Sequence, residues 1–370
     1  METKLTSRLF LALAFYASTS TAQVSAPQID SVFSSLKSGT APGAAVLVVR
    51  NGRTVFRRGY GVTDLRTLRP IDSTTNFRLA SMTKQFTAAC TMLLVHDGKL
   101  HYEDHLTDFF PEFPAYGKAI TVRNLLNHTS GLPDYEGILA SQYPNTPDDQ
   151  IPQIHDAAVL KLLEQQETAK FPAGSKWQYS NSGYVLLGLI VERVSGMSFG
   201  QFLQEKVFAP LKMDQTLPYE KGKNEVPHRA YGHTCEKSTC RETDQSSTSA
   251  TLGDGGIYTS LDDLAKWDRA LQEHTLLSEA EMRPALTPVA PSRGRAQSAE
   301  APVSYGFGWF LDPYKGHRRM WHDGETMGFR TTIQRFLDNK LTVIILANRT
   351  DVNPQELALK VANLYLNSKR

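Results

Sequence analysis

The chain has little net charge, few cysteines and, beyond its first residues, no long hydrophobic run. Its 40 Lys and Arg residues nearly balance 38 Asp and Glu residues, and the formal net charge is +2 with no basic stripe. Nucleic-acid binding depends on clustered cations that neutralise phosphates, so the composition does not support a nucleic-acid partner. A bilayer-spanning helix needs about 20 apolar residues, and we expect no stable membrane span in the mature chain.

The N-terminus has the pattern of a secretory signal peptide. Lys4 and Arg8 precede an apolar run over residues 9–17, and small residues follow up to Ala22. This run is too short to cross a membrane, and the order of charge, apolar centre and small residues is typical of a cleaved export signal. We predict that residues 1–22 are removed and that the mature protein, residues 23–370, is periplasmic or secreted.

Three cysteines are present, and two of them are close in sequence. Cys235 and Cys240 flank a short polar loop, and an oxidising compartment would allow them to pair; the alternative is two free thiols. Cys90 lies in an apolar segment and is expected to be a small core residue. We predict a disulfide between Cys235 and Cys240.

Strand signals lie near both ends of the chain, and helix signals dominate its middle. Asn51 and Gly52 form a strong turn signal between two strand-like runs. We therefore predict an α/β (α+β) fold, in which N- and C-terminal strands build one antiparallel sheet covered by the terminal helices. A mostly helical lobe, at about 81–299, is inserted into an α/β lobe formed by about 27–80 and 300–370. Further strands are predicted at 305–311, 318–322, 329–336 and 341–347, and helices at 27–37, 121–128, 152–166, 181–194, 198–208, 260–271 and 354–366.

Ser81 precedes Lys84 by three residues at the start of an apolar helical segment. Residues i and i+3 share one face of a helix, so the lysine amine would lie over the serine hydroxyl. A helix N-terminus also offers unpaired backbone N–H groups and about half a positive charge. The pair can therefore act as a nucleophile and its base; the alternative is a capping serine beside an exposed lysine. Ser34 and Lys37 share the spacing, but they lie late in their helix.

A serine nucleophile also needs proton transfer and donors for the developing oxyanion. Tyr179 and Asn181 stand at the start of the long apolar segment 181–194. The tyrosine can transfer protons, and the asparagine amide can hold a substrate carbonyl. The alternatives are a buried tyrosine and a helix-capping asparagine. The same pattern at 143–145 and 365–367 lies in less suitable contexts, a loop rich in Pro and Asp and the terminal helix.

The sequence His-Asp-Gly at 322–324 ends one strand-like segment shortly before another. An edge strand with a small glycine, Gly324, lets a substrate backbone lie alongside it. The backbone N–H of Glu325 can then join that of Ser81 as an oxyanion pair. The same triplet at 96–98 closes a helix, where Gly98 has the position of a C-terminal cap.

The ordered set Ser-Met-Thr-Lys at 81–84, Tyr-Ser-Asn at 179–181 and His-Asp-Gly at 322–324 resembles the serine β-lactamase and penicillin-binding-protein superfamily. The resemblance is closest to its class C β-lactamase-related branch, which includes D-Ala-D-Ala carboxypeptidases, D-aminopeptidases and family VIII carboxylesterases. The segments 127–133 and 252–258 also resemble stretches common in that branch. The resemblance extends over about residues 28–368.

The resemblance implies a reaction through a covalent acyl-serine. Ser81 would be the nucleophile, Lys84 the neutral amine that helps to deprotonate it, and Tyr179 the proton relay. The residues implied in substrate binding are Asn181 for the carbonyl, His322 and Gly324 on the docking strand, and Glu325 for its backbone donor. No cofactor is implied, and the partner is a small-molecule or peptide substrate.

The third motif departs from the family pattern, because true β-lactamases and many peptidases have Lys-Thr-Gly there. A lysine is a permanent cation for a substrate carboxylate, whereas a histidine with an ordinary pKa near 6.5 is only partly charged at neutral pH. We therefore expect an exported serine hydrolase that acts on a short-chain ester, a D-amino-acid peptide or a peptidoglycan-related substrate. The alternatives are a weak β-lactamase and a penicillin-binding or peptidoglycan-sensing protein without turnover.

His101 and His105 have the i, i+4 spacing of a metal-binding pair on a helix. The stretch that contains them is short and polar and follows a helix cap. A metallohydrolase is therefore the weaker alternative, and we expect no metal at the active site.

Overall fold

A five-stranded antiparallel sheet forms the centre of the computed structural model, which describes residues 24–236, 239–289 and 304–367. The strand order is β2-β1-β10-β9-β8, so the N-terminal hairpin and the C-terminal strands share one sheet. The predicted composite sheet is therefore confirmed, and β8 is an edge strand. The bounds are β1 (Ala44–Arg50), β2 (Arg53–Tyr60), β8 (Arg319–Thr326), β9 (Phe329–Phe336) and β10 (Leu341–Ala347).

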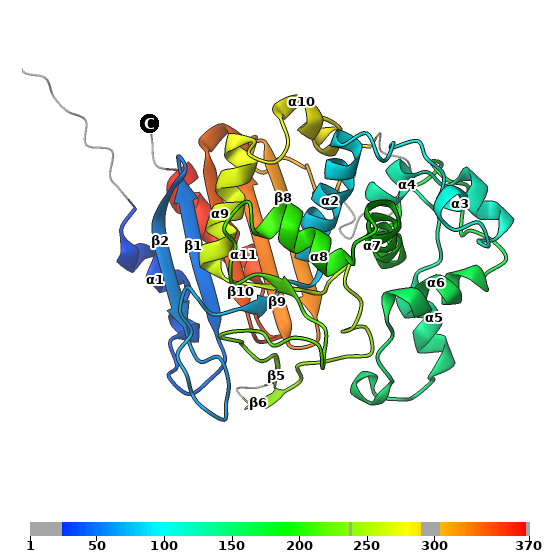
Figure 1. Cartoon of the computed structure of the whole chain (residues 1–370). Coiled ribbons are helices and arrows are strands. Elements are labelled where there is room, and N and C mark those ends of the chain that lie inside the picture. Colours follow the sequence, from blue (N-terminus) through cyan, green and yellow to red (C-terminus); the bar gives the residue numbers. More distant parts are fainter. Residues whose placement is uncertain (1–23, 237–238, 290–303, 368–370) are drawn as a thin grey trace, which may run out of the picture.

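Helices cover both faces of this sheet, which explains why β1 is an unbroken apolar run up to Arg50. On one face, α1 (Ala26–Val32) and α11 (Pro354–Leu366) pack with Val46 and Val48 in one core cluster. On the other face, α9 (Leu261–Glu273) contacts β1 and β10, in the core that also contains α2 (Lys84–His96). The terminal helices thus lie behind the sheet, as predicted, and α2 begins the opposite layer (Figure 1).

The remaining helices lie mostly beyond α2, on the side of the molecule away from β1 and β2 (Figure 1). The buried helix α7 is central to this group and contacts α2, α4 and α6. The predicted helix at 121–128 ends two residues early, because His128 adopts a left-handed conformation with φ of 62°. The bounds are α3 (Leu106–Phe109), α4 (Val122–Leu126), α5 (Tyr135–Gln142), α6 (Asp156–Glu164), α7 (Asn181–Ser195), α8 (Phe199–Leu203), continued by a π-helical turn (Gln204–Phe208), and α10 (Glu279–Met282).

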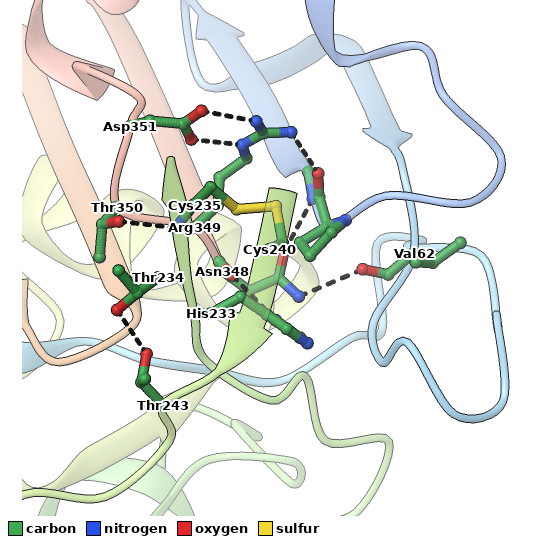
Figure 2. Close-up of a disulfide and its surroundings, with 12 residues drawn as sticks. Val62, His233, Thr234, Cys235, Cys240, Thr243, Asn348, Arg349, Thr350 and Asp351 are labelled. Carbon is green, nitrogen blue, oxygen red and sulfur yellow. Dashed lines mark hydrogen bonds and ion pairs between the residues drawn. A yellow bond between two sulfur atoms is a disulfide. The ribbon is translucent and has the colours of Figure 1, made fainter. Parts of the chain in front are cut away.

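Two small sheets complete the part of the fold that the structure describes. β3 (Phe77–Arg78), β7 (Ile257–Thr259) and β4 (Leu217–Pro218) form one of them, and the hairpin of β5 (His233–Glu236) and β6 (Thr239–Glu242) forms the other. Cys235 and Cys240 lie opposite each other in this hairpin and form the predicted disulfide (Figure 2). The side-chain amide of Asn348 donates to the backbone oxygens of Val62 and Tyr231, which fixes the base of the hairpin to the end of β10.

The strand predicted at 305–311 is wrong. The segment folds back on itself, with the Gly306 N–H donating to Trp309 O at 2.8 Å. Gly308 has a φ of +76°, and a Cβ there would lie 2.8 Å from Lys84 O. Close packing against the start of α2 therefore requires a left-handed glycine, and this interrupts the extended pattern.

Within the three described ranges, no single helix is long and apolar enough to cross a membrane; α7 and the segment 199–208 reach that length only as a pair bent by 80°. The predicted signal peptide, residues 1–22, lies outside the described residues. The boundaries of the two lobes stay a prediction. Cys90 is a buried free thiol in α2, as predicted.

Candidate active site

Ser81 lies at the floor of a cleft of about 770 Å³, in a 3-10 turn (Ala80–Thr83) that leads directly into α2. The strand β3 delivers the chain to this turn, and Leu79 donates its N–H to Ile257 O at 2.8 Å. Ala80 then adopts a φ of 50°, which is uncommon for a residue other than glycine. The sharp bend leaves Ser81 partly exposed just before the α-helix begins.

The Lys84 amine is fully buried beneath Ser81 and makes three short polar contacts. Its Nζ lies 3.0 Å from Ser81 Oγ, 2.7 Å from Asn181 Oδ1 and 3.0 Å from Asp254 O. It also lies 4.9 Å from the centre of the Tyr179 ring. The predicted contact between amine and hydroxyl is therefore present, and two further segments of chain meet at the same nitrogen.

Burial lowers the pKa of Lys84 from 10.5 to about 8, because the charged amine loses its hydration. The neighbouring carboxylates of Asp254, Glu136 and Asp134 act in the opposite direction and favour the charged form. The outcome is an amine that is partly neutral near physiological pH. Such an amine is suited to accept a proton from a hydroxyl.

Tyr179 also lines the cleft and reaches the same point from the segment just before α7. Its hydroxyl makes no hydrogen bond of standard geometry within the described part of the chain, but it lies close enough to Ser81 for that hydroxyl to affect its pKa. Burial raises the pKa of Tyr179 well above its ordinary value, and the interaction with Ser81 opposes this only in part. The phenol is therefore protonated at neutral pH.

Asn181 is the first residue of α7, and its side chain lines the cleft. The helix cap is Ser180, whose hydroxyl accepts the Gly183 N–H, so the alternative of a capping asparagine is wrong. Asp134 accepts the Asn181 N–H at 2.9 Å and holds this end of the helix. Because Asn181 Oδ1 accepts from Lys84, its amide N–H groups remain as donors for a ligand in the cleft.

His322 lies in the cleft wall, but it is not the partly charged group that its ordinary pKa suggests. It is 2% exposed, and burial and the nearby Lys84 charge lower its pKa to about 3. One ring nitrogen contacts Asp323 O at 2.6 Å and the other contacts the Tyr305 hydroxyl at 3.1 Å. The expected partial charge is therefore wrong, since His322 is neutral at physiological pH.

The sequence placed Gly324 and its neighbours at the end of a strand. In the structure they lie inside β8. A Cβ at Gly324 would lie 2.0 Å from Leu79 O, so the glycine lets β8 pack against the turn that carries Ser81. Thr331 reinforces this contact by donating to Leu79 O at 2.8 Å. Glu325 follows at the cleft edge, with its exposed carboxylate 2.8 Å from Arg330.

The competing motifs do not meet at this cleft. Ser34 is exposed in a 3-10 turn beside α1, and Lys37 is exposed as well. Tyr143 follows α5 at the surface, and Tyr365 lies in α11. His101 and His105 are exposed, and among the described residues no group of three or more His, Cys, Asp or Glu is arranged to hold a metal ion.

The charges that line the cleft are mostly negative. The guanidinium groups of Arg78 and Arg319 are buried and already bonded, the first to Ser249 and Gly255 and the second to Asp312 and Gln334. Partial desolvation, together with the nearby carboxylates of Asp134 and Asp254, raises the pKa of Glu136 to about 7, although part of its side chain is exposed to solvent. Burial raises the pKa of Asp323 to about 7. The lining carboxylates are those of Glu136, Asp254, Asp312, Asp323 and Glu325.

Three residues outside the predicted set of site residues hold the site together. The backbone oxygen of Asp254 accepts a hydrogen bond from Lys84 Nζ, and the carboxylate of Asp134 accepts one from the Asn181 N–H. The Tyr305 hydroxyl contacts His322. The segment 252–258, which contains Asp254, was noted in the sequence only because it resembles a stretch common in the family. A backbone contact has no side-chain signature, so its role could not be read from residue type.

Comparisons with known proteins agree with this geometry. The family model described as Beta-lactamase matches residues 29–366. The chain is 32% identical over 352 residues to penicillin-binding protein 4* of Bacillus subtilis, covering 91% of this chain and 75% of that protein. It is 28% identical over 334 residues to the D-aminopeptidase of Brucella canis, covering 88% of this chain and 60% of that protein.

Among solved structures, an octameric penicillin-binding protein homologue from Pyrococcus abyssi superposes with a TM-score of 0.80 at 25% identity, covering 93% of this chain and 78% of the other. The sheet, the cleft and the match over nearly the whole described chain lead to one assignment. The protein belongs to the Beta-lactamase family and is a serine hydrolase of that family.

Proposed function

We propose that this protein is an exported serine hydrolase that cleaves an ester or amide through a covalent acyl-serine. Ser81 Oγ attacks the carbonyl carbon while its proton passes to Lys84 Nζ. The bond from that carbon to the leaving oxygen or nitrogen then breaks, and the leaving group takes up a proton. Water attacks the acyl carbon next, and the serine oxygen leaves with a proton.

The arrangement around Lys84 Nζ carries this proposal. Asn181 Oδ1 and Asp254 O can only accept, so they take the two hydrogens of a neutral amine. The lone pair of that amine then faces Ser81 Oγ at 3.0 Å. Two acceptors and one hydroxyl match the two hydrogens and one lone pair of a neutral lysine, which supports its role as the base.

Tyr179 acts in proton transfer as a phenol and not as a resident phenolate. Its raised pKa keeps the proton on oxygen, so the hydroxyl can give that proton to the leaving group while it accepts another from Lys84. The oxyanion is held by the backbone N–H groups of Ser81 and Glu325, and Asn181 holds a second carbonyl of the substrate. These roles rest on position in the cleft and on the family pattern.

The charges of the cleft favour substrates without a carboxylate beside the scissile bond. A neutral histidine, His322, occupies the place where a family lysine would meet that carboxylate. The lining arginines are already bonded within the protein, and the lining carboxylates outnumber them, so the cleft disfavours an anion. Short-chain esters and D-amino-acid amides or peptides therefore fit better than β-lactams, and the similarity to a D-aminopeptidase supports the second class.

Export is supported by the signal-like pattern at residues 1–22 and by the disulfide between Cys235 and Cys240, since disulfides persist in oxidising compartments. Expression of the full chain in a Gram-negative host, with N-terminal sequencing of the periplasmic product, tests this part. The expected first residue is Gln23, and recovery of the unprocessed chain in the cytosol contradicts export.

A side-by-side assay tests the reaction and its substrates. Wild type and Ser81→Ala are given p-nitrophenyl butyrate, a D-amino-acid p-nitroanilide, nitrocefin and a D-Ala-D-Ala peptide. Steady turnover of the first or second substrate that Ser81→Ala abolishes supports the proposal. Preferred turnover of nitrocefin would instead indicate a weak β-lactamase, and a stable penicillin adduct without turnover would indicate a penicillin-binding sensor.

A further inference from the structure

His128 holds the chain on both sides of Tyr179. Its backbone oxygen accepts the Gln178 N–H at 3.0 Å. Its ring nitrogen Nδ1 accepts the Ser180 N–H at 3.2 Å. Since Gln178 and Ser180 are the two neighbours of Tyr179, one residue fixes the backbone before and after the phenol.

The ring of His128 also packs against the phenol itself. The ring centres of His128 and Tyr179 are 4.3 Å apart, and Tyr305 lies on the same imidazole at 4.5 Å. Tyr305 contacts His322 in turn, so the imidazole is linked to both Tyr179 and His322, which line the cleft. These contacts restrict the directions in which the Tyr179 ring can move.

The placement of His128 reduces the stability of the fold in two ways, through an unpaired ring nitrogen and through its backbone conformation. The side chain is fully buried, and its Nε2 has no hydrogen-bond partner among the described residues. Because Nδ1 accepts from Ser180, the proton lies on Nε2, and a buried unpaired N–H costs on the order of 1–3 kcal/mol. The backbone is also left-handed, with φ of 62°. Strained backbone conformations cluster at functional sites.

We propose that His128 is a positioning residue that sets the Tyr179 hydroxyl at Ser81 for proton transfer. This inference rests on the function proposed above. His128 does not touch the reacting atoms; it acts through the phenol. Proton transfer needs heavy atoms within about 3 Å, and a displacement of about 1 Å can cost about 100-fold in rate.

Two substitutions of similar shape separate the hydrogen bond from simple packing. His128→Asn keeps an acceptor near the position of Nδ1 and tolerates a left-handed backbone, whereas His128→Leu has the same branching and no acceptor. We expect His128→Leu to lower kcat about 100-fold with KM within about twofold, and His128→Asn to recover at least about tenfold of that loss. His101→Phe, at an exposed histidine, is the control and keeps wild-type kcat.

The same substitutions in the Tyr179→Phe background show whether His128 acts through the phenol. Single-turnover release of p-nitrophenol keeps the slow variants measurable, and thermal melting reports folding. We expect each His128 substitution to change the Tyr179→Phe rate less than twofold, because the group it positions is gone. If His128→Leu does not fold, His128→Asn in the two backgrounds gives the same comparison.

Losses that multiply in the Tyr179→Phe background, or equal rates for the asparagine and leucine variants, would overturn the positioning role. The proposed function fails separately, if Ser81→Ala or Tyr179→Phe leaves hydrolysis unchanged. Loss of activity in those two variants together with a fully active His128→Leu would reject the inference alone.

Discussion

The replacement Asn181→Asp tests the Lys84 base by placing a charge beside it. With a pKa of about 8, about one tenth of the lysine is neutral at pH 7 and about nine tenths at pH 9, so kcat/KM should rise about tenfold between them. Asn181 Oδ1 lies 2.7 Å from the amine, and a carboxylate in its place stabilises the ammonium. An opposite charge at this range shifts a pKa by about 1–3 units. The rise should therefore begin about one unit or more higher in pH.

The measurement is kcat/KM for p-nitrophenyl butyrate from pH 6 to 10.5, with correction for spontaneous hydrolysis. Asn181→Asp also weakens substrate binding, so the position of the rise is the readout and not its height. Asn145→Asp makes the same change on an exposed loop and should keep the wild-type profile. A flat profile between pH 6 and 9, or a rise that Asn181→Asp leaves in place, would refute the role of Lys84.

Three other predictions concern stability and packing. Gly324→Ala should destabilise the fold by about 3 kcal/mol in urea unfolding, because its Cβ meets Leu79 O at 2.0 Å, whereas Gly137→Ala in α5, with nothing within 4 Å, should not; equal effects would contradict this. The folded pKa of Lys84, about 8, lies below its unfolded value of 10.5, so the unfolded chain binds the extra proton, and stability rises with pH between these values. Wild type should gain about 3 kcal/mol relative to Lys84→Met from pH 8 to pH 10.5, and parallel curves would exclude the shift. Replacing Cys235 and Cys240 by serine should cost about 2 kcal/mol by loop-closure entropy with kcat unchanged, and an unchanged melting temperature would contradict it.

Local signals in the sequence were enough for the parts of the fold that short-range chemistry determines. Asn51 and Gly52 adopt the left-handed angles that a two-residue hairpin turn requires, with φ of 51° and 73°. The terminal helix covers Pro354–Leu366, as its periodicity predicted. The serine and lysine of the first motif are adjacent because one helical turn separates them, so their contact needed no tertiary information.

Tertiary packing determines the features that local sequence patterns did not predict correctly. The 305–311 segment alternates like a strand, but Gly308 turns left-handed where it meets the backbone of Lys84. The charge of His322 depends on burial, which its residue type does not reveal. The contact of Gly324 with Leu79 was not predicted, and its role beside a substrate stays a prediction.

Covalent labelling of the intact protein tests the central claim most directly. The protein is treated with a fluorophosphonate, digested and analysed by mass spectrometry, with Ser81→Ala as the comparison. We predict a single phosphonylated site at Ser81, formed faster as pH rises through about 8 as Lys84 loses its proton. An adduct on Ser34, or labelling that persists unchanged in Ser81→Ala, would contradict the assignment of the nucleophile.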